Sequence, residues 1–262
     1  MSAAATMGWR ANLATIAALV SRAKNELVRV PGAVIPGVLA PTIFFLGLNG
    51  VFANLTQLTG FTTDSYASFL VPVSILQGAG FTGAATGVNL ARDIEQGWLD
   101  RLLASPAPRW VLLTGMVASA SLRAFIPATA VLLVAFAVGA HWPGIDGLLI
   151  AYAMVAATAA VAACYASGLA LHYKSQSAAP LMQAGVLALI LGTTAYAPLE
   201  LMEGWLQDIA RVNPMTQVVD AARQGFLGGI TWAEIWPGVL ALAAMLAVVA
   251  AFALRGMRRM GK

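Results

Sequence analysis

The amino-acid sequence predicts an all-α polytopic membrane protein, and three observations lead to that fold class. Hydrophobic residues make up 60% of the 262 residues and charged residues 10%, against about 25% charged in an ordinary soluble domain. A soluble protein of 27.1 kDa has too much surface to hide that many apolar side chains. The charges are clustered, and the apolar runs between them lack the alternation of a membrane β-strand, so helical spans are expected.

Six spanning helices account for the charge-free stretches, because about 20 apolar residues cross roughly 30 Å of hydrocarbon. We place them at residues 34–53, 66–90, 111–139, 147–171, 177–197 and 233–254. The whole chain, 1–262, is expected to form one membrane domain. Its parts are an N-terminal segment (1–31), a six-helix part (34–254) and a basic tail (255–262).

The basic residues predict the orientation of the chain. Twelve of the fifteen Lys and Arg residues fall on one side of this topology, and the acidic residues show the opposite bias. Basic residues are retained on the cytoplasmic side of a membrane. We therefore expect a multi-pass protein of the cytoplasmic (plasma or inner) membrane with both termini in the cytoplasm.

Residues 9–30 have the pattern of an amphipathic helix and not of a signal peptide. Apolar residues can share one broad face of this helix, namely Leu13, Ile16, Ala17, Val20, Leu27 and Val28. Charged residues remain exposed to solvent, namely Arg22, Lys24, Glu26 and Arg29. Such a helix lies in the cytoplasmic interface near anionic headgroups. Pro31 and Pro36 then turn the chain into the membrane. An ordinary basic leader that anchors the topology is the alternative.

Several familiar sequence motifs occur in surroundings that do not support the function they usually indicate. A G-x-G-x-x-G pattern at 78–83 lies inside a predicted span, where Gly83 and Gly87 favour close helix packing instead. The C-terminal G-x-x-x-x-G-K lacks the following Ser or Thr and any helix to receive a phosphate. His141 and His172 have no partner at ligand spacing, so no metal site is predicted. No nucleophile has a positioned base, and no catalytic residue is predicted.

The connection between the second and third spans departs from the apolar pattern. Arg92, Asp93 and Glu95 end a long helix, and Gly97 permits a sharp turn. A short amphipathic helix follows, with an apolar side and a charged side made of Trp98, Leu99, Leu102 and Leu103 and of Asp100 and Arg101, respectively. Such a helix suits the docking of a soluble partner. A loop lying on the membrane surface explains the pattern equally well.

A second departure follows the fifth span. Residues 198–226 predict two short helices, the second with Pro214 in its first turn and Asn213 as its N-cap. Asp220 and Arg223 are three residues apart and can form a local pair. We favour that structural role over a role in substrate binding.

A lone charge, Arg123, lies about a dozen residues into the third span. A charge at mid-bilayer costs roughly 2.5–3.5 kcal/mol, so this residue should face the bundle or a wet cavity. Asn89, Gln77 or a partner subunit could then satisfy it. Alternatively, Arg123 snorkels to the cytoplasmic surface.

The two polar segments resemble those of type-2 ABC transporter permeases. The run Asp93-x-Glu95-x-Gly97-x-x-Asp100-Arg101-Leu102, followed by Pro106, Arg109 and a spanning helix, is similar to the signature of that family. The form with Asp100-Arg101 and Ser105-Pro106 is closest to the daunorubicin-resistance (drug-exporter) branch. The run Asn213-Pro214-x-Thr216 with Asp220 and Arg223 resembles a recurring pattern in the family's re-entrant outer-leaflet helices.

The resemblance implies roles for three sets of residues. The coupling helix, which seats in a cleft of an ATP-binding subunit, would comprise Asp93, Glu95, Gly97, Trp98, Asp100, Arg101 and Leu102. The outer re-entrant motif would comprise Asn213, Pro214, Thr216, Asp220 and Arg223. A substrate path lined mainly by the first, second and fifth spans has as its candidates Phe44, Phe45, Gln77, Asn89, Arg123 and Tyr196. Two separately encoded ATP-binding subunits, which bind ATP and Mg²⁺, and a second permease, identical or related, would complete the transporter.

The resemblance implies the membrane subunit of an ATP-driven exporter, and the largely apolar lining of its candidate path favours hydrophobic or amphipathic cargo such as drugs, polyketides or lipids. The chain itself is expected to bind no cofactor and to carry no ATPase site. Membrane lipid and the apolar cargo are its expected partners, and no nucleic acid is expected. An intramembrane enzyme such as a lipid-modifying transferase is one alternative, although its acids would need to cluster. A passive channel or scaffold is another, although it would not need the docking helix.

Overall fold

The computed structural model describes residues 8–29, 35–57 and 63–260. These residues form helices and turns and contain no strand, which confirms the all-α fold class. Pro31, where the sequence predicts a turn, lies outside the described residues. Leu27 and Val28, predicted for the apolar face, lie in a described helix, but their side chains are not described.

The helices are, in chain order, α1 (Trp9–Arg29), α2 (Ile35–Phe52), α3 (Tyr66–Glu95), α4 (Trp98–Leu103), α5 (Arg109–Ala137), α6 (Gly144–Tyr173), α7 (Ala179–Leu191), α8 (Gly204–Val212), α9 (Pro214–Arg223) and α10 (Trp232–Arg259). Short 3-10 turns lie at Ala53–Gln57, Gln176–Ala178, Leu199–Leu201 and Gln224–Leu227. Among the described residues, five helical segments are long and apolar enough to cross a membrane, namely α2 with its following turn, α3, α5, α6 and α10.

Helix α7 is shorter than the span predicted there. The sequence predicts a helix over 177–197, but α7 ends at Leu191. The side-chain amide of Asn213 donates hydrogen bonds of 2.8 Å to the carbonyls of Leu189 and Gly192. Irregular backbone is tolerated in a membrane protein where buried groups satisfy it. The count of six spans therefore stays a prediction, with five long helices and one short apolar helix in place.

Helix α3 lies at the centre of the bundle and contacts α2, α5, α6, α7 and α9. Small residues bring it close to α6, as predicted. A Cβ added to Gly83 would lie 2.5 Å from the carbonyl oxygen of Ala159, and one added to Gly87 would lie 2.6 Å from that of Ala166. Both glycines therefore serve helix packing.

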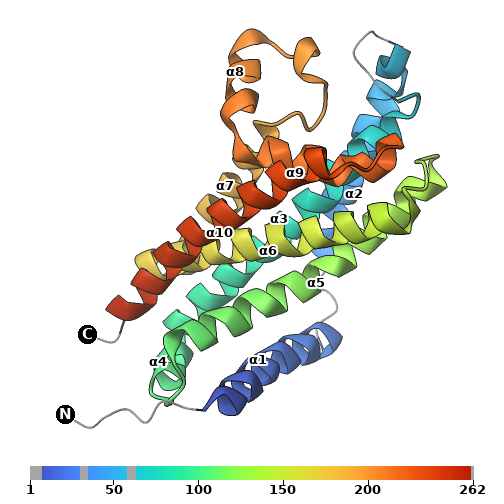
Figure 1. The fold of residues 1–262 in the computed structure, drawn as a ribbon. Coiled ribbons are helices and arrows are strands. Elements are labelled where there is room, and N and C mark those ends of the chain that lie inside the picture. Colours follow the sequence, from blue (N-terminus) through green and yellow to red (C-terminus); the bar gives the residue numbers. More distant parts are fainter. Residues whose placement is uncertain (1–7, 30–34, 58–62, 261–262) are drawn as a thin grey trace.

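The two ends of the bundle differ (Figure 1). The start of α1, helix α4 and the end of α10 lie together at one end, which we call the α4 end, and α8 lies at the opposite end, the α8 end.

Helix α1 runs along α5, with Leu19 against Gly115. Leu13, predicted for the packing face, is 54% exposed, whereas Ala23 is buried. The contact with α5 therefore uses a narrower stripe of α1 than the sequence predicts, because α5 is the helix that α1 mainly packs against.

Candidate functional site

Helix α4 is built as the sequence predicts. Gly97 adopts the left-handed conformation (φ 66°), which turns the chain sharply after α3. Leu99 is fully buried and anchors the short helix against the bundle. Asp100 and Arg101 are exposed. The helix ends where the Ser105 hydroxyl donates a 2.6 Å hydrogen bond to the carbonyl of Leu102. This arrangement presents two opposite charges at the α4 end.

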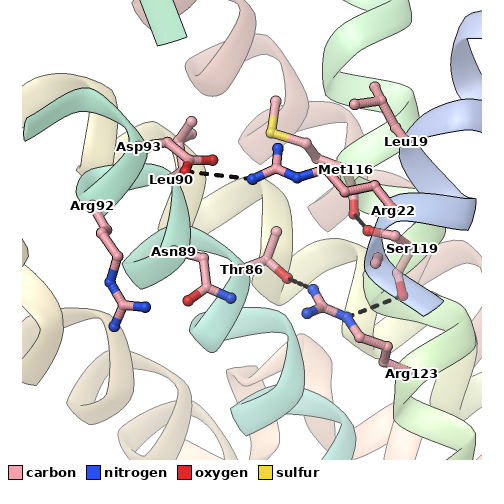
Figure 2. A pocket seen from close by; sticks show the side chains of 11 residues that line it. Leu19, Arg22, Thr86, Asn89, Leu90, Arg92, Asp93, Met116, Ser119 and Arg123 are labelled. Atoms are coloured by element: carbon pink, nitrogen blue, oxygen red, sulfur yellow. Dashed lines mark hydrogen bonds and ion pairs between the residues drawn. The ribbon is translucent and has the colours of Figure 1, made fainter. Parts of the chain in front are cut away.

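Arg22 connects α1 to this helix. Its guanidinium carbon lies 3.8 Å from the centre of the Trp98 ring. Its Nη2 lies 3.6 Å from Oδ1 of Asp93, at the end of α3 (Figure 2). One side chain therefore joins α1, α3 and α4. The sequence places Arg22 on a solvated face and gives no local signal for this contact, because the partners lie far along the chain.

Glu95 ties the end of α3 to the turn between α6 and α7. Its carboxylate accepts hydrogen bonds from the Ser175 hydroxyl at 2.8 Å, the Gln176 backbone N–H at 2.8 Å and the Gln176 side-chain amide at 2.6 Å. Asp93 and Glu95, both predicted to lie in the coupling segment, thus have partners within the chain. Asp100 and Arg101 are the predicted coupling residues that α4 presents outward.

A cavity of about 80 Å³ lies beside this junction, between α1, α3 and α5. Figure 2 shows its lining, with Asn89 on α3 between the guanidinium groups of Arg123 and Arg92. Arg123 donates from Nη2 to the Thr86 hydroxyl at 2.9 Å and from Nε to the Ser119 carbonyl at 3.3 Å. Arg123, the charge inside the third predicted span, therefore faces the bundle, as predicted, and Thr86 and Ser119 are among its partners.

The six predicted path residues do not converge on one site. Asn89 and Arg123 line the same cavity. Phe44 is 49% exposed on α2, whereas the adjacent Phe45 is fully buried. Gln77 is buried within α3, and the carbonyl of Tyr196 accepts a hydrogen bond from the hydroxyl of Tyr66, the first residue of α3.

The predicted local structure around α9 is confirmed. Asn213 caps the helix, since its Oδ1 accepts from the backbone N–H of Met215 at 2.9 Å, and Pro214 occupies the first turn. The Thr216 hydroxyl donates to the carbonyl of Ala210 at 2.7 Å and joins α9 to α8. The motif thus holds two short helices in a fixed relation.

Arg223 and Asp220 form the predicted pair, with 3.1 Å between Nη1 and Oδ1. Arg223 is buried and also donates to the carbonyls of Phe69 (3.2 Å) and Thr194 (2.8 Å). Burial raises the pKa of the Asp220 carboxyl above its usual value, although Arg223 and the hydrogen bond from Thr194 act in the opposite direction. These contacts link α9 to α3 and to the irregular chain after α7, which is a structural role.

A second cavity lies between α6, α7 and α10 and was not found from the sequence. Its volume is about 460 Å³, and its lining is apolar apart from a few groups, among them Thr158 and Tyr165. The Thr158 hydroxyl is buried, and no described residue offers it a hydrogen bond. The lining found in the described residues includes none of the predicted path residues. Small residues in its lining, such as Gly80 and Gly185, are the sequence feature that could have indicated this cavity.

Long apolar helices around a buried central helix define a multi-pass helical membrane protein. Within the described ranges, no three His, Cys, Asp or Glu side chains are placed to hold a metal ion. The model of the ABC-2 type transporter family matches residues 14–227, and the chain belongs to that family.

The relatives of the chain are transport permeases. It is 26% identical over 211 residues to a putative transport permease, ycf38, of Cyanophora paradoxa, covering 78% of this chain and 71% of the relative. It is 26% identical over 245 residues to the daunorubicin resistance ABC transporter permease DrrB1 of Streptomyces coeruleorubidus, covering 90% and 82%. It is 30% identical over 161 residues to the probable multidrug ABC transporter permease YbhR of Escherichia coli K12, covering 58% and 42%.

Proposed function

We propose that this chain is the membrane subunit of an ATP-driven exporter of hydrophobic or amphipathic compounds. Helix α4 carries the proposal, because it presents Asp100 and Arg101 outward at the end of the central helix. A soluble ATP-binding subunit can bind such a projecting helix in a cleft on its surface. Two copies of that subunit bind ATP and Mg²⁺, and a second permease, identical or related, completes the complex. The permease names of the relatives support this proposal.

The proposed orientation places the α4 end in the cytoplasm of a plasma or inner membrane. The predominance of basic residues near α1, α4 and the end of α10 supports this orientation. The Arg109 guanidinium also donates a 2.8 Å hydrogen bond to the carbonyl of Arg258, which joins the start of α5 to the end of α10 on this side.

Movement of α4 can reach the other end of the bundle through α3. The 30 residues of α3 span about 45 Å at 1.5 Å per residue. At its far end, the carbonyl of Phe69 accepts from Arg223 of α9. Closure of the ATP-binding subunits would push α4, and the stiff central helix would carry that displacement to α9. The chain thus converts an external conformational change into a change of affinity for cargo.

The cavity between α6, α7 and α10 is the proposed site for part of the cargo. Its volume of about 460 Å³ falls within the range of roughly 300–1,000 Å³ that ligand pockets occupy. The apolar lining favours hydrocarbon or aromatic groups, and the Thr158 hydroxyl offers one hydrogen bond to a polar atom. Met215 and Met245 give the wall adaptable side chains.

Membrane vesicles that contain this chain and its ATP-binding subunit test the proposal. We expect the two subunits to co-purify and a hydrophobic cargo to stimulate ATP hydrolysis. Asp100→Lys should uncouple hydrolysis from transport without changing the unfolding temperature, because Asp100 is exposed. Asp208→Lys, an exposed acid on α8, is the matched control and should couple normally. Normal transport by the Asp100→Lys variant would contradict the docking role of α4.

A further inference from the structure

We propose that the cavity between α1, α3 and α5 binds the phosphate group of an anionic membrane lipid. This inference concerns the binding of a ligand to the resting protein, and it does not depend on the proposed transport function. It rests on the charge of the cavity, its size, and its position beside the amphipathic helix α1.

The lining of the cavity is rich in cations. Three arginines line it, namely Arg22, Arg92 and Arg123. Asp93 is the one acidic residue that the described part of the chain contributes to this lining. Arg123 donates hydrogen bonds to the Thr86 hydroxyl and the Ser119 carbonyl, which hold its guanidinium at the wall of the cavity. Guanidinium groups suit phosphate because their planar forks donate two parallel hydrogen bonds to its oxygens.

Arg22 of α1, Asn89 of α3 and Arg123 of α5 come from three different helices and line the same cavity, whereas Arg92 donates from Nε to Gln176 Oε1 at 3.4 Å. Figure 2 shows Arg22 of α1 and Arg123 of α5 on one side, with Asn89 of α3 lying between Arg123 and Arg92. The Asn89 side chain is half-buried and can donate or accept. Convergence from three helices distinguishes this site from a row of surface cations on one helix.

The size and surroundings of the cavity select the ligand. A volume of about 80 Å³ holds a group such as phosphate and not a whole lipid. The remaining lining is apolar and includes Leu19, Leu90 and Met116, against which the first carbons of an attached chain can pack. Since α1 has the amphipathic pattern of an interfacial helix, a lipid headgroup lies at the right depth to enter.

Occupation of the site would stabilise the junction with α4. Arg22 lines the cavity and at the same time lies over the Trp98 ring. A phosphate that binds Arg22 would restrict the guanidinium to the position in which it also contacts α4. The ligand therefore favours the observed arrangement of α1 and α4.

Native mass spectrometry of the full chain in detergent tests the site, with phosphatidylglycerol and with diacylglycerol of the same acyl chains as probes. We expect one tightly retained phosphatidylglycerol per chain and no comparable retention of diacylglycerol. Arg22→Gln and Asn89→Leu should each weaken that retention about tenfold, as expected for loss of a strong polar contact to phosphate. Asn89→Leu leaves the Arg22–Asp93 pair in place, so its effect reports binding independently of the α1–α4 junction.

Arg10→Gln is the matched control, because Arg10 lies on the same helix and near Trp9, away from the cavity lining. It removes the same charge from α1 and should leave retention unchanged. Equal losses in Arg10→Gln and Arg22→Gln, or equal retention of the two lipids, would overturn the proposal. Inorganic phosphate tests for a soluble source. Arg22-dependent thermal stabilisation by millimolar phosphate, without retention of phosphatidylglycerol, would overturn the lipid assignment in favour of a soluble phosphate ester.

Discussion

The guanidinium of Arg22 lies 3.8 Å from the centre of the Trp98 ring, and this contact joins the amphipathic helix α1 to the short helix α4. The same guanidinium lies 3.6 Å from the Asp93 carboxylate. A displacement of either α1 or α4 would therefore act on the other helix through the Arg22 side chain.

Arg22→Lys separates the stacked contact from the charge. Lysine keeps the positive charge near Asp93 but loses the planar group that lies over Trp98. We expect transport per ATP hydrolysed to fall several-fold while the free energy of unfolding changes by about 0.5–1 kcal/mol, as for an exposed cation–π contact. Transport and hydrolysis rates measured in the same vesicles check this. Arg10→Lys is the control, and equal coupling in both variants would refute the proposed link.

Gly87→Ala tests the close packing of α3 on α6. The added Cβ would lie 2.6 Å from the carbonyl oxygen of Ala166, so the two helices must separate. We expect a loss of about 1–3 kcal/mol in the free energy of unfolding, as for other overpacked cores. Thermal unfolding in detergent measures it. Gly47→Ala is the control because an added Cβ there meets nothing within 4 Å. Equal unfolding temperatures for both variants would show that this packing is not tight.

The parts of the fold that the sequence predicts are those with local signals. Gly97 marks the turn into α4, and Asn213 with Pro214 marks the start of α9; both are found where expected. The end of α7 at Leu191 was missed because the stretch without charges continues to Leu199, although Gly192 and the two threonines after it are a local signal for a helix end. The carbonyls at this end also accept hydrogen bonds from Asn213, more than 20 residues later, and no local pattern predicts such contacts.

Asn213→Asp distinguishes the two roles of this side chain. Aspartate is as good an N-cap as asparagine, so a pure cap would tolerate the change. However, the carboxylate in this variant lacks the N–H donor that serves the carbonyls of Leu189 and Gly192.

We therefore expect this variant to unfold with a loss of about 1–2 kcal/mol, measured by thermal unfolding. Asn54→Asp, at an exposed position in the turn after α2, should have no such effect. Full stability of the Asn213→Asp variant would show that Asn213 acts as a cap and does not end α7.

Arg223→Met tests the buried pair in α9. The change leaves Asp220 without its cation and removes the donor from the carbonyls of Phe69 and Thr194. We expect a loss of about 3 kcal/mol in the free energy of unfolding, the low end for a broken buried pair, because the Asp220 side chain is 38% exposed.

Chemical unfolding of Arg223→Met beside Arg211→Met measures that loss. Arg211 forms an exposed pair with Asp208 at 3.8 Å, and its removal should cost less than about 1 kcal/mol. Similar losses in the two variants would contradict the structural role of Arg223.

The sequence predicts the motifs of the candidate site, but it does not predict the contacts that their side chains make. The short helix with Asp100 and Arg101 exposed follows from its amphipathic pattern. The partners of Arg22, Glu95 and Arg123 come from other helices, and many residue types could have supplied them. The cavity between α6, α7 and α10 was likewise missed, because its lining consists of apolar residues that resemble ordinary core or lipid-facing positions.

Site-specific crosslinking would show whether α4 docks an ATP-binding subunit. The single native cysteine, Cys164, is buried and would be replaced by alanine. A photoreactive group would then be attached at Arg101→Cys on α4, or at Asp208→Cys on α8 at the opposite end. We expect an adduct with the ATP-binding subunit from position 101 and none from position 208. An adduct from position 208, or none from position 101 in a complex that co-purifies, would contradict docking by α4.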